Sequence, residues 1–158
     1  MRLTLLSWAP VFLLPISNII VCICSGSFPS ADSSLLLTVG LAAVCEELFF
    51  RGLVLKCWLL PRLKPVCAVV LSAVIFGAAH ILNWRGILSF DLVLPQIIFA
   101  VCFGVWAGAA VYRKDSILLP VLAHVLLNVT DQPIYLTWPW AVVAGITLID
   151  GVVLLAED

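Results

Sequence analysis

A cluster of charged residues within a long apolar run is the feature that most limits how this sequence can fold. The run covers residues 35–60 and contains Glu46, Glu47 and Arg51 near its centre. A charge at membrane depth costs at least ~2.5–3.5 kcal/mol, so such residues usually face the protein interior and serve a function. In a helix, Glu47 and Arg51 are an i,i+4 pair, whereas Glu46 lies about 140° around the axis from Arg51. The pattern predicts a structural Glu47–Arg51 ion pair and a reactive Glu46; a buried ion pair beside a spectator glutamate is the alternative.

The composition places the chain in a membrane. Of its 158 residues, 64% are hydrophobic and 11% are charged, whereas soluble domains carry roughly 25% charged residues. We therefore expect an all-α fold, a polytopic transmembrane helical bundle of about six spans. One integral-membrane domain is expected over residues 1–158, with a motif-bearing core at 35–130. The expected spans are residues 3–24, 35–60, 65–82, 92–112, 117–129 and 141–156.

Charge and cysteine content narrow the function classes. The net charge is −1 and the chain has no basic tail, so a nucleic acid is not an expected partner. The six cysteines all lie in apolar runs and form no Cys-x-x-Cys pair. We interpret them as small buried hydrophobic residues, with neither a disulfide framework nor a thiolate metal site.

The two histidines of the chain lie on separate apolar segments. His80 falls in the third expected span and His124 in the fifth, where Asn128 shares its helix face at i,i+4. With Glu46, these residues supply what amide hydrolysis needs. A carboxylate can act as general base on a water, and an imidazole can orient that water or protonate the leaving amine. Asn128 and a histidine can donate hydrogen bonds to the oxyanion.

The same side chains could instead hold a metal ion that activates the water for hydrolysis. Two histidines and one glutamate form a common zinc set with an open position for water, and the ligands here would be Glu46, His80 and His124. The usual His-Glu-x-x-His spacing on one helix is absent. These residues alone do not choose between the two chemistries.

Three motifs occur in order on three hydrophobic segments: Glu46-Glu47-x-x-x-Arg51, Phe76-x-x-x-His80 and His124-x-x-x-Asn128. They resemble the motifs of the CPBP/Abi family of intramembrane endopeptidases, which includes the type II CAAX prenyl proteases. The resemblance spans about half of the chain and implies an all-helical membrane protease core. It implies a catalytic centre of Glu46, His80, His124 and Asn128, with Glu47 and Arg51 beside it. We count Glu47 among the catalytic candidates, and Arg51 and Phe76 as supporting residues.

Members of that family have been described as metalloproteases and, alternatively, as glutamate enzymes without a metal. We favour the glutamate type and no cofactor, because Glu46 is expected to be free of Arg51; Zn²⁺ is the alternative. The expected function is an intramembrane endopeptidase acting in the lipid bilayer on a membrane-anchored protein or peptide. A non-catalytic membrane immunity or partner-binding protein of the same family is one alternative, and a small proton-coupled transporter is another.

The charges between the spans predict an orientation. One side of the expected bundle has five Lys/Arg against one, Arg85, on the other side. The positive-inside rule then puts the N- and C-termini in the cytoplasm. We expect a multi-pass protein of a bacterial or archaeal plasma membrane, with its active site opening to the extracytoplasmic side. The five residues are Arg2, Arg62, Lys64, Arg113 and Lys114.

Overall fold

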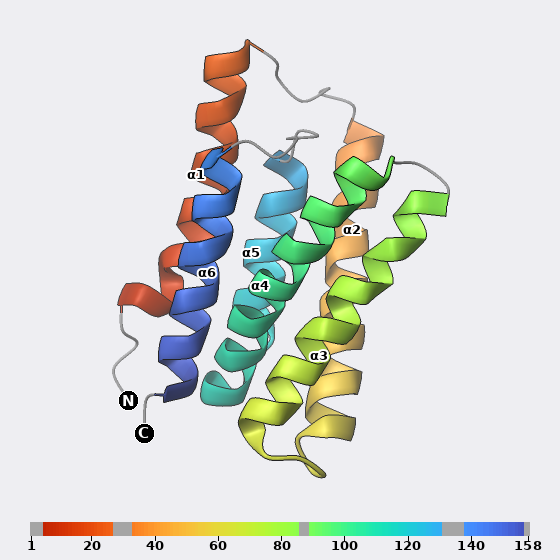
Figure 1. Ribbon diagram of the computed structural model, residues 1–158, viewed down its shortest axis with the longest axis vertical. Coiled ribbons are helices and arrows are strands. Elements are labelled where there is room, and N and C mark those ends of the chain that lie inside the picture. The colour runs from red at the N-terminus through yellow and green to blue at the C-terminus, as the bar shows by residue number, and fades with distance from the viewer. Residues whose placement is uncertain (1–4, 27–32, 86–88, 131–137, 157–158) are drawn as a thin grey trace.

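The chain is a bundle of helices (Figure 1). The computed structural model describes residues 5–26, 33–85, 89–130 and 138–156, and these contain no strand. This confirms the expected all-α helical bundle. The helices are α1 (Leu5–Ser25), α2 (Ser33–Glu47), η1 (Leu48–Leu59), α3 (Pro65–Ala79), η2 (His80–Arg85), α4 (Phe90–Lys114), α5 (Leu118–Thr130) and α6 (Trp138–Ala156).

The six expected spans each correspond to a helix, but the helices differ in length. Three helical stretches within the described residues are long and apolar enough to cross a membrane: Ser33–Leu59, Pro65–Asn83 and Phe90–Lys114. The apolar stretches of the other three helices are shorter: Trp8–Cys24, Leu118–Thr130 and Ala141–Ala156. α5 has 13 residues, which corresponds to about 20 Å at ~1.5 Å per residue, less than the ~30 Å of a bilayer's hydrocarbon core. α5, the shortest of the six α-helices, is also the one that carries His124 and Asn128.

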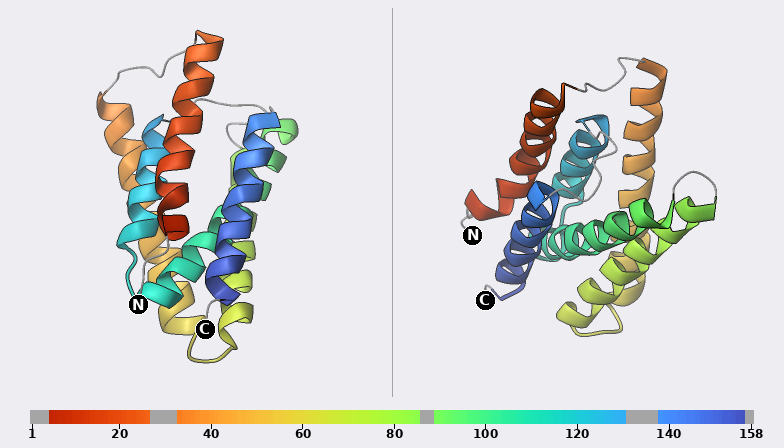
Figure 2. Two further views of the ribbon diagram at one scale, coloured as in Figure 1. Left: turned by 90° about the vertical axis from the view of Figure 1, so that its left-hand side faces the viewer. Right: turned by 45° about the horizontal axis from the view of Figure 1, so that its top comes forward.

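The bundle has two layers, seen side by side in the left view of Figure 2. One layer contains α2, α5 and α1, and the other contains α3, α4 and α6. Contacts between α1 and α6 join the layers along one edge, and contacts between η1 and α3 join them along the other. Successive spans run in opposite directions (Figure 1), so the beginning of α1 and the end of α6 lie at the same end as the η1–α3 and α4–α5 turns.

The second span changes its winding immediately after the glutamate pair. α2 is an α-helix up to Glu47, and the 12 residues of η1 then form a wider π-helix. At its end, the Leu60 N–H donates to the Leu55 carbonyl, 2.9 Å away and five residues back. Ser72 of α3 donates a hydrogen bond to the Phe50 carbonyl at 3.3 Å. A uniform α-helix over 35–60 is therefore the wrong description of its second half, and π-turns are frequent at functional sites.

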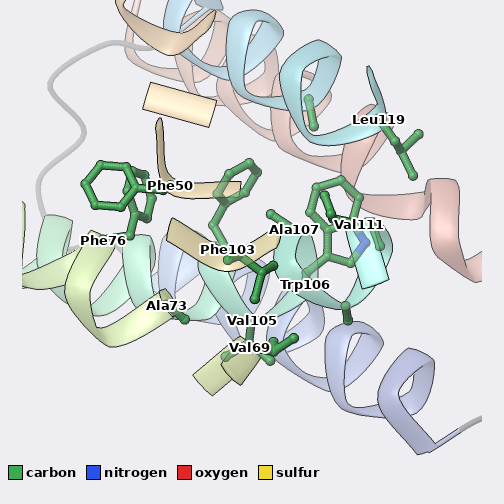
Figure 3. Close-up of a cluster of buried hydrophobic side chains, with 14 of the residues drawn as sticks. Phe50, Val69, Ala73, Phe76, Phe103, Val105, Trp106, Ala107, Val111 and Leu119 are labelled. Carbon is green, nitrogen blue, oxygen red and sulfur yellow. The ribbon is translucent and has the colours of Figure 1, made fainter. Parts of the chain in front are cut away.

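Glycines bring α3 and α4 into close contact. A Cβ added to Gly104 would lie 2.9 Å from the Ala73 Cα, and one added to Gly108 would lie 3.0 Å from Val69. The Gly104-x-x-x-Gly108 pattern therefore is a packing seam, as small residues often are between membrane helices. This close approach makes α4 the central helix of the core, whose buried side chains are drawn in Figure 3.

Four of the six cysteines are exposed, although we expected all six to be buried. Cys24, Cys45, Cys57 and Cys67 are exposed on the outside of the bundle, and Cys22 is buried. The expectation of six buried cysteines is wrong for these four, because a membrane bundle presents apolar residues to lipid as readily as to its core. Their position in apolar runs could not distinguish the two surroundings.

Candidate active site

The motif residues meet where both layers come together, around the junction of α2 and η1. Glu46 and Glu47 end α2, and Arg51 follows in the first turn of η1. Phe76 comes from the last turn of α3, and His124 from the middle of α5. The structure brings these five residues into contact, although they come from three separate stretches of the sequence.

Glu47 is the centre of the site's polar contacts. Its Oε1 lies 3.0 Å from Nη1 of Arg51 and 2.9 Å from Nδ1 of His124. The side chains of Glu47 and Arg51 are only 0% and 1% exposed. The predicted Glu47–Arg51 ion pair is thus confirmed, and the structure adds a contact with His124 that the sequence did not predict.

The contact with Glu47 determines how His124 can act. An ionised carboxylate only accepts hydrogen bonds, so an ionised Glu47 beside a neutral His124 requires the proton on Nδ1 and leaves a lone pair on Nε2. Nε2 lies 3.8 Å from Oε2 of Glu46, which is too long for a direct hydrogen bond. The Glu46 side chain is 39% exposed, in contrast to the fully buried Glu47. The two neighbouring glutamates therefore have different surroundings, one locked in a buried network and one accessible.

Phe76 forms the apolar wall of this network. The Arg51 guanidinium lies 4.2 Å from the centroid of the Phe76 ring, within the range of a cation–π interaction. The ring also makes edge contacts with His80 and His124, at centroid distances of 4.9 and 5.9 Å. Phe76 thus shields the buried charges and contacts both imidazoles.

In the part of the chain that the structure describes, His80 and Asn128 make their hydrogen bonds to backbone carbonyls and not to the Glu46–His124 pair. The Phe76 carbonyl accepts a hydrogen bond from Nδ1 of His80 at 3.0 Å, and Nδ2 of Asn128 donates to the Val39 carbonyl at 3.4 Å. Asn128 lies about 6 Å beyond His124 along α5. No hydrogen bond or ion pair within the described residues joins either side chain to Glu46. The structure therefore places these two candidates beside the Glu46–His124 pair rather than in contact with it.

The arrangement does not fit a three-ligand zinc site. Zinc ligands must lie about 2.0–2.3 Å from one ion, so their donor atoms converge. Within the described part of the chain, no three His, Cys, Asp or Glu side chains are grouped closely enough to share a metal ion. Both imidazoles pack against the edge or face of the Phe76 ring, and Nδ1 of His124 contacts Glu47. A Zn²⁺ ion held by Glu46, His80 and His124 therefore stays a prediction from the sequence alone.

Sequence reasoning missed two aromatic residues of the site. Phe103 of α4 lies 5.2 Å from His124 and Phe50 of η1 lies 5.0 Å from Phe76, measured between ring centroids. Figure 3 shows Phe50, Phe76 and Phe103 gathered on one side of the core. Phe99 and Phe103 are spaced i,i+4, a pattern that indicated one aromatic face of α4 but not which side chains it would meet.

The comparisons with known proteins agree with this geometry. A family model described as Type II CAAX prenyl endopeptidase Rce1-like matches residues 30–130. The chain belongs to this family. The match includes every motif residue from Glu46 to Asn128, and it confirms the resemblance on which the sequence analysis relied. It assigns the chain to an integral membrane family with a CAAX-protease-like role. Searches of curated proteins and of solved structures gave no match.

The buried ion pair leads to a stability prediction. Arg51→Ala leaves the buried Glu47 carboxylate without its cation, which should lower the free energy of unfolding by about 3–5 kcal/mol. Thermal unfolding in detergent and the yield of folded protein measure this change.

Lys56 provides the matched control for Arg51. It lies in the same helix, and its Nζ is 2.6 Å from Oδ1 of Asp115, but both side chains are accessible. Lys56→Ala should therefore change stability by only about 0–1 kcal/mol. Equal losses for the two variants would show that burial does not decide the importance of the Arg51–Glu47 pair.

Proposed function

We propose that the protein is an intramembrane endopeptidase of the glutamate type, which hydrolyses a peptide bond of a membrane-anchored protein or peptide. The observation that carries the proposal is the chain of contacts from Arg51 through Glu47 to His124, which leaves Nε2 of His124 directed at Glu46. Membership of an endopeptidase family supports the reaction class.

In the proposed mechanism, one water lies between Oε2 of Glu46 and Nε2 of His124. The 3.8 Å between these atoms lets a single water donate a hydrogen bond to each. Glu46 takes a proton from the water as its oxygen attacks the scissile carbonyl carbon. The tetrahedral intermediate collapses, the C–N bond breaks, and the protonated Glu46 returns its proton to the leaving amine. His124 fixes the water throughout, and Glu47 holds the imidazole in the required tautomer.

Asn128 is the proposed donor to the oxyanion. Its Nδ2 carries two hydrogens, of which one is directed at the Val39 carbonyl. The other can stabilise the negative charge on the carbonyl oxygen of the intermediate. His80 donates from Nδ1 to Phe76, so a neutral His80 offers a lone pair at Nε2. In this proposal it accepts a hydrogen bond from the substrate or a second water rather than donating to the oxyanion.

The substitution Glu46→Gln tests the proposal, since it removes the base and keeps the shape of the side chain. Cleavage should fall by about 10²–10⁴-fold, the usual contribution of a general base, with no loss of folded protein. The chain is co-expressed with a farnesylated CAAX-tailed protein and with a membrane-tethered protein that has an unmodified hydrophobic tail. Mass spectrometry then identifies the products.

The exposed Asp91, at the beginning of α4, provides a matched carboxylate-to-amide control. Asp91→Asn should cleave at the wild-type rate, and full turnover by Glu46→Gln would contradict the assignment of the base. Wild-type activity should also survive dialysis against a strong chelator. A loss that added Zn²⁺ restores would favour the metal-dependent alternative. Failure of the wild-type protein to cleave either substrate would favour the non-catalytic, partner-binding alternative.

The orientation in the membrane is a second part of the proposal. The turns that contain Arg62 and Asp115 lie at the same end of the bundle as the beginning of α1 (Figure 1); Arg2 itself is outside the described residues. Loop charge supports a cytoplasmic location for this end. Glu46 is halfway along Ser33–Leu59, and His80 is close to the far end of Pro65–Asn83. Water and substrate would then enter the site from the extracytoplasmic side.

Single thiols test this orientation in intact cells, on a background in which the six native cysteines are replaced. Ser89, just before α4, and Lys64, just before α3, are both exposed. The beginnings of α3 and α4 lie at opposite ends of the bundle (Figure 1). Ser89→Cys should react with a membrane-impermeant reagent, and Lys64→Cys should react only after lysis. The reverse pattern would overturn the orientation and the proposed entrance together.

A further inference from the structure

Two carboxamides outside the three motifs are hydrogen-bonded next to the site. Nδ2 of Asn83 in η2 donates to Oε1 of Gln96 in α4 at 2.9 Å, and both side chains are partly buried. The bond connects the two arms of the α3–α4 hairpin. Because Asn83 follows His80 by three residues, the pair is adjacent to a catalytic candidate.

The winding of η2 directs Asn83 to the same side as His80. Residues i and i+3 eclipse one another in a 3₁₀-helix, so the two side chains share one face. The intervening Ile81 and Leu82 are 50% and 69% exposed, whereas His80 and Asn83 are partly buried. Over residues 80–83, η2 therefore exposes its apolar side chains and partly buries its polar ones.

Gln96 belongs to the face of α4 that continues to His124. Gln96, Phe99 and Phe103 are spaced i,i+3,i+7 on one helical stripe. The Phe103 ring lies 5.2 Å from the His124 ring and 6.4 Å from the Phe99 ring. Seven residues of α4 correspond to about 10 Å, so Gln96 lies about that far from the level of His124.

The Asn83–Gln96 bond leaves hydrogen-bonding groups unused on both side chains. Asn83 keeps its Oδ1 and the second hydrogen of Nδ2, and Gln96 keeps both hydrogens of Nε2. Their side-chain hydrogen bonding within the described residues is the single bond between them. An acceptor beside a donor matches the N–H and C=O groups that an extended peptide presents along its edge.

We infer that Asn83 and Gln96 bind the backbone of the substrate. This inference rests on the proposed endopeptidase function and adds to it a binding site for an extended segment. A scissile bond in a membrane-anchored helix must be unwound before it is cleaved. The N–H and C=O groups freed at membrane depth then need protein partners. Asn83 accepts a hydrogen bond from a substrate N–H, and Gln96 donates to a substrate C=O.

The distance along α4 between Gln96 and the level of His124 indicates which substrate residue the Asn83–Gln96 pair would bind. At about 3.3 Å per residue of extended chain, 10 Å corresponds to about three residues from the scissile bond. Recognition through the backbone does not depend on the side chain at that position. The site therefore selects segments that unwind easily, rather than a particular residue three positions from the cut.

The inference is tested by combining amide-to-ester changes in the substrate peptide with substitutions in the protein and measuring the binding affinity of each combination. The probes are the farnesylated CAAX peptide and the unmodified membrane-tethered peptide, each with one amide at a time replaced by an ester, which removes one N–H. Affinity is measured by fluorescence anisotropy in the Glu46→Gln background, where no turnover interferes. One ester position about three residues from the cut should weaken binding about 2- to 10-fold, as expected for one hydrogen bond. Asn83→Ala should weaken binding of the all-amide peptide by a similar factor. In this variant, the ester at that position should cause no further loss of affinity.

Asn18 of α1 is a carboxamide outside the three motifs and outside the Asn83–Gln96 pair, and it donates to Thr130 Oγ1 at 3.4 Å. Asn18→Ala should retain the full ester effect. Gln96→Met, which keeps the length of the side chain, provides a second variant if Asn83→Ala reduces folding, and it too should diminish the ester effect. An ester effect that is unchanged in both Asn83→Ala and Gln96→Met would overturn the inference. Because cleavage by the wild-type protein is measured separately, that result would leave the endopeptidase proposal standing.

Discussion

The site depends on one buried contact, the carboxylate of Glu47 held between Arg51 and His124. A charge removed from water is tolerated only if it is paired and hydrogen-bonded, and here Oε1 contacts both partners within 3.0 Å. The Phe76 ring covers the guanidinium on its other side. Oε2 of the same carboxylate, like Nη1 and Nη2 of Arg51, is buried without a hydrogen-bond partner among the described residues. Three helical segments therefore have to assemble before Oε1 has both of its partners, which couples folding of the bundle to the geometry of the candidate active site.

This contact also separates the roles of two adjacent glutamates. Glu47 is fully buried and fixes the imidazole, whereas Glu46 is partly exposed and faces the free nitrogen of that imidazole. The change from α-helix to π-helix after Glu47 occurs within this group, and the Ser72–Phe50 hydrogen bond joins the π-helix to α3. The glycine seam then holds α3 against α4, so that Phe76 and Phe103 form a continuous aromatic wall behind His124.

The features that could be predicted from the sequence are those that depend on the spacing of neighbouring residues along the chain. Apolar runs located the six helices, and the i,i+4 rule identified the Glu47–Arg51 pair. The contact between Glu47 and His124 joins residues 77 positions apart, and no periodicity specifies such a pairing. The π-helix depends on the contact with α3, and propensity for either helix type is a weak guide to it. Similarly, the positions of His80 and Asn128 depend on how η2 and α5 pack, which the motifs did not specify.

The tautomer of His124 is the most direct test of this account. The chain has only two histidines, so His80→Gln leaves His124 as the single imidazole for ¹⁵N NMR of the purified protein in detergent. The account predicts a neutral ring with its proton on Nδ1 and an unprotonated Nε2, and a loss of this preference in the additional variant Glu47→Ala. A proton on Nε2, or the same spectrum with and without Glu47, would contradict the central role of the buried carboxylate.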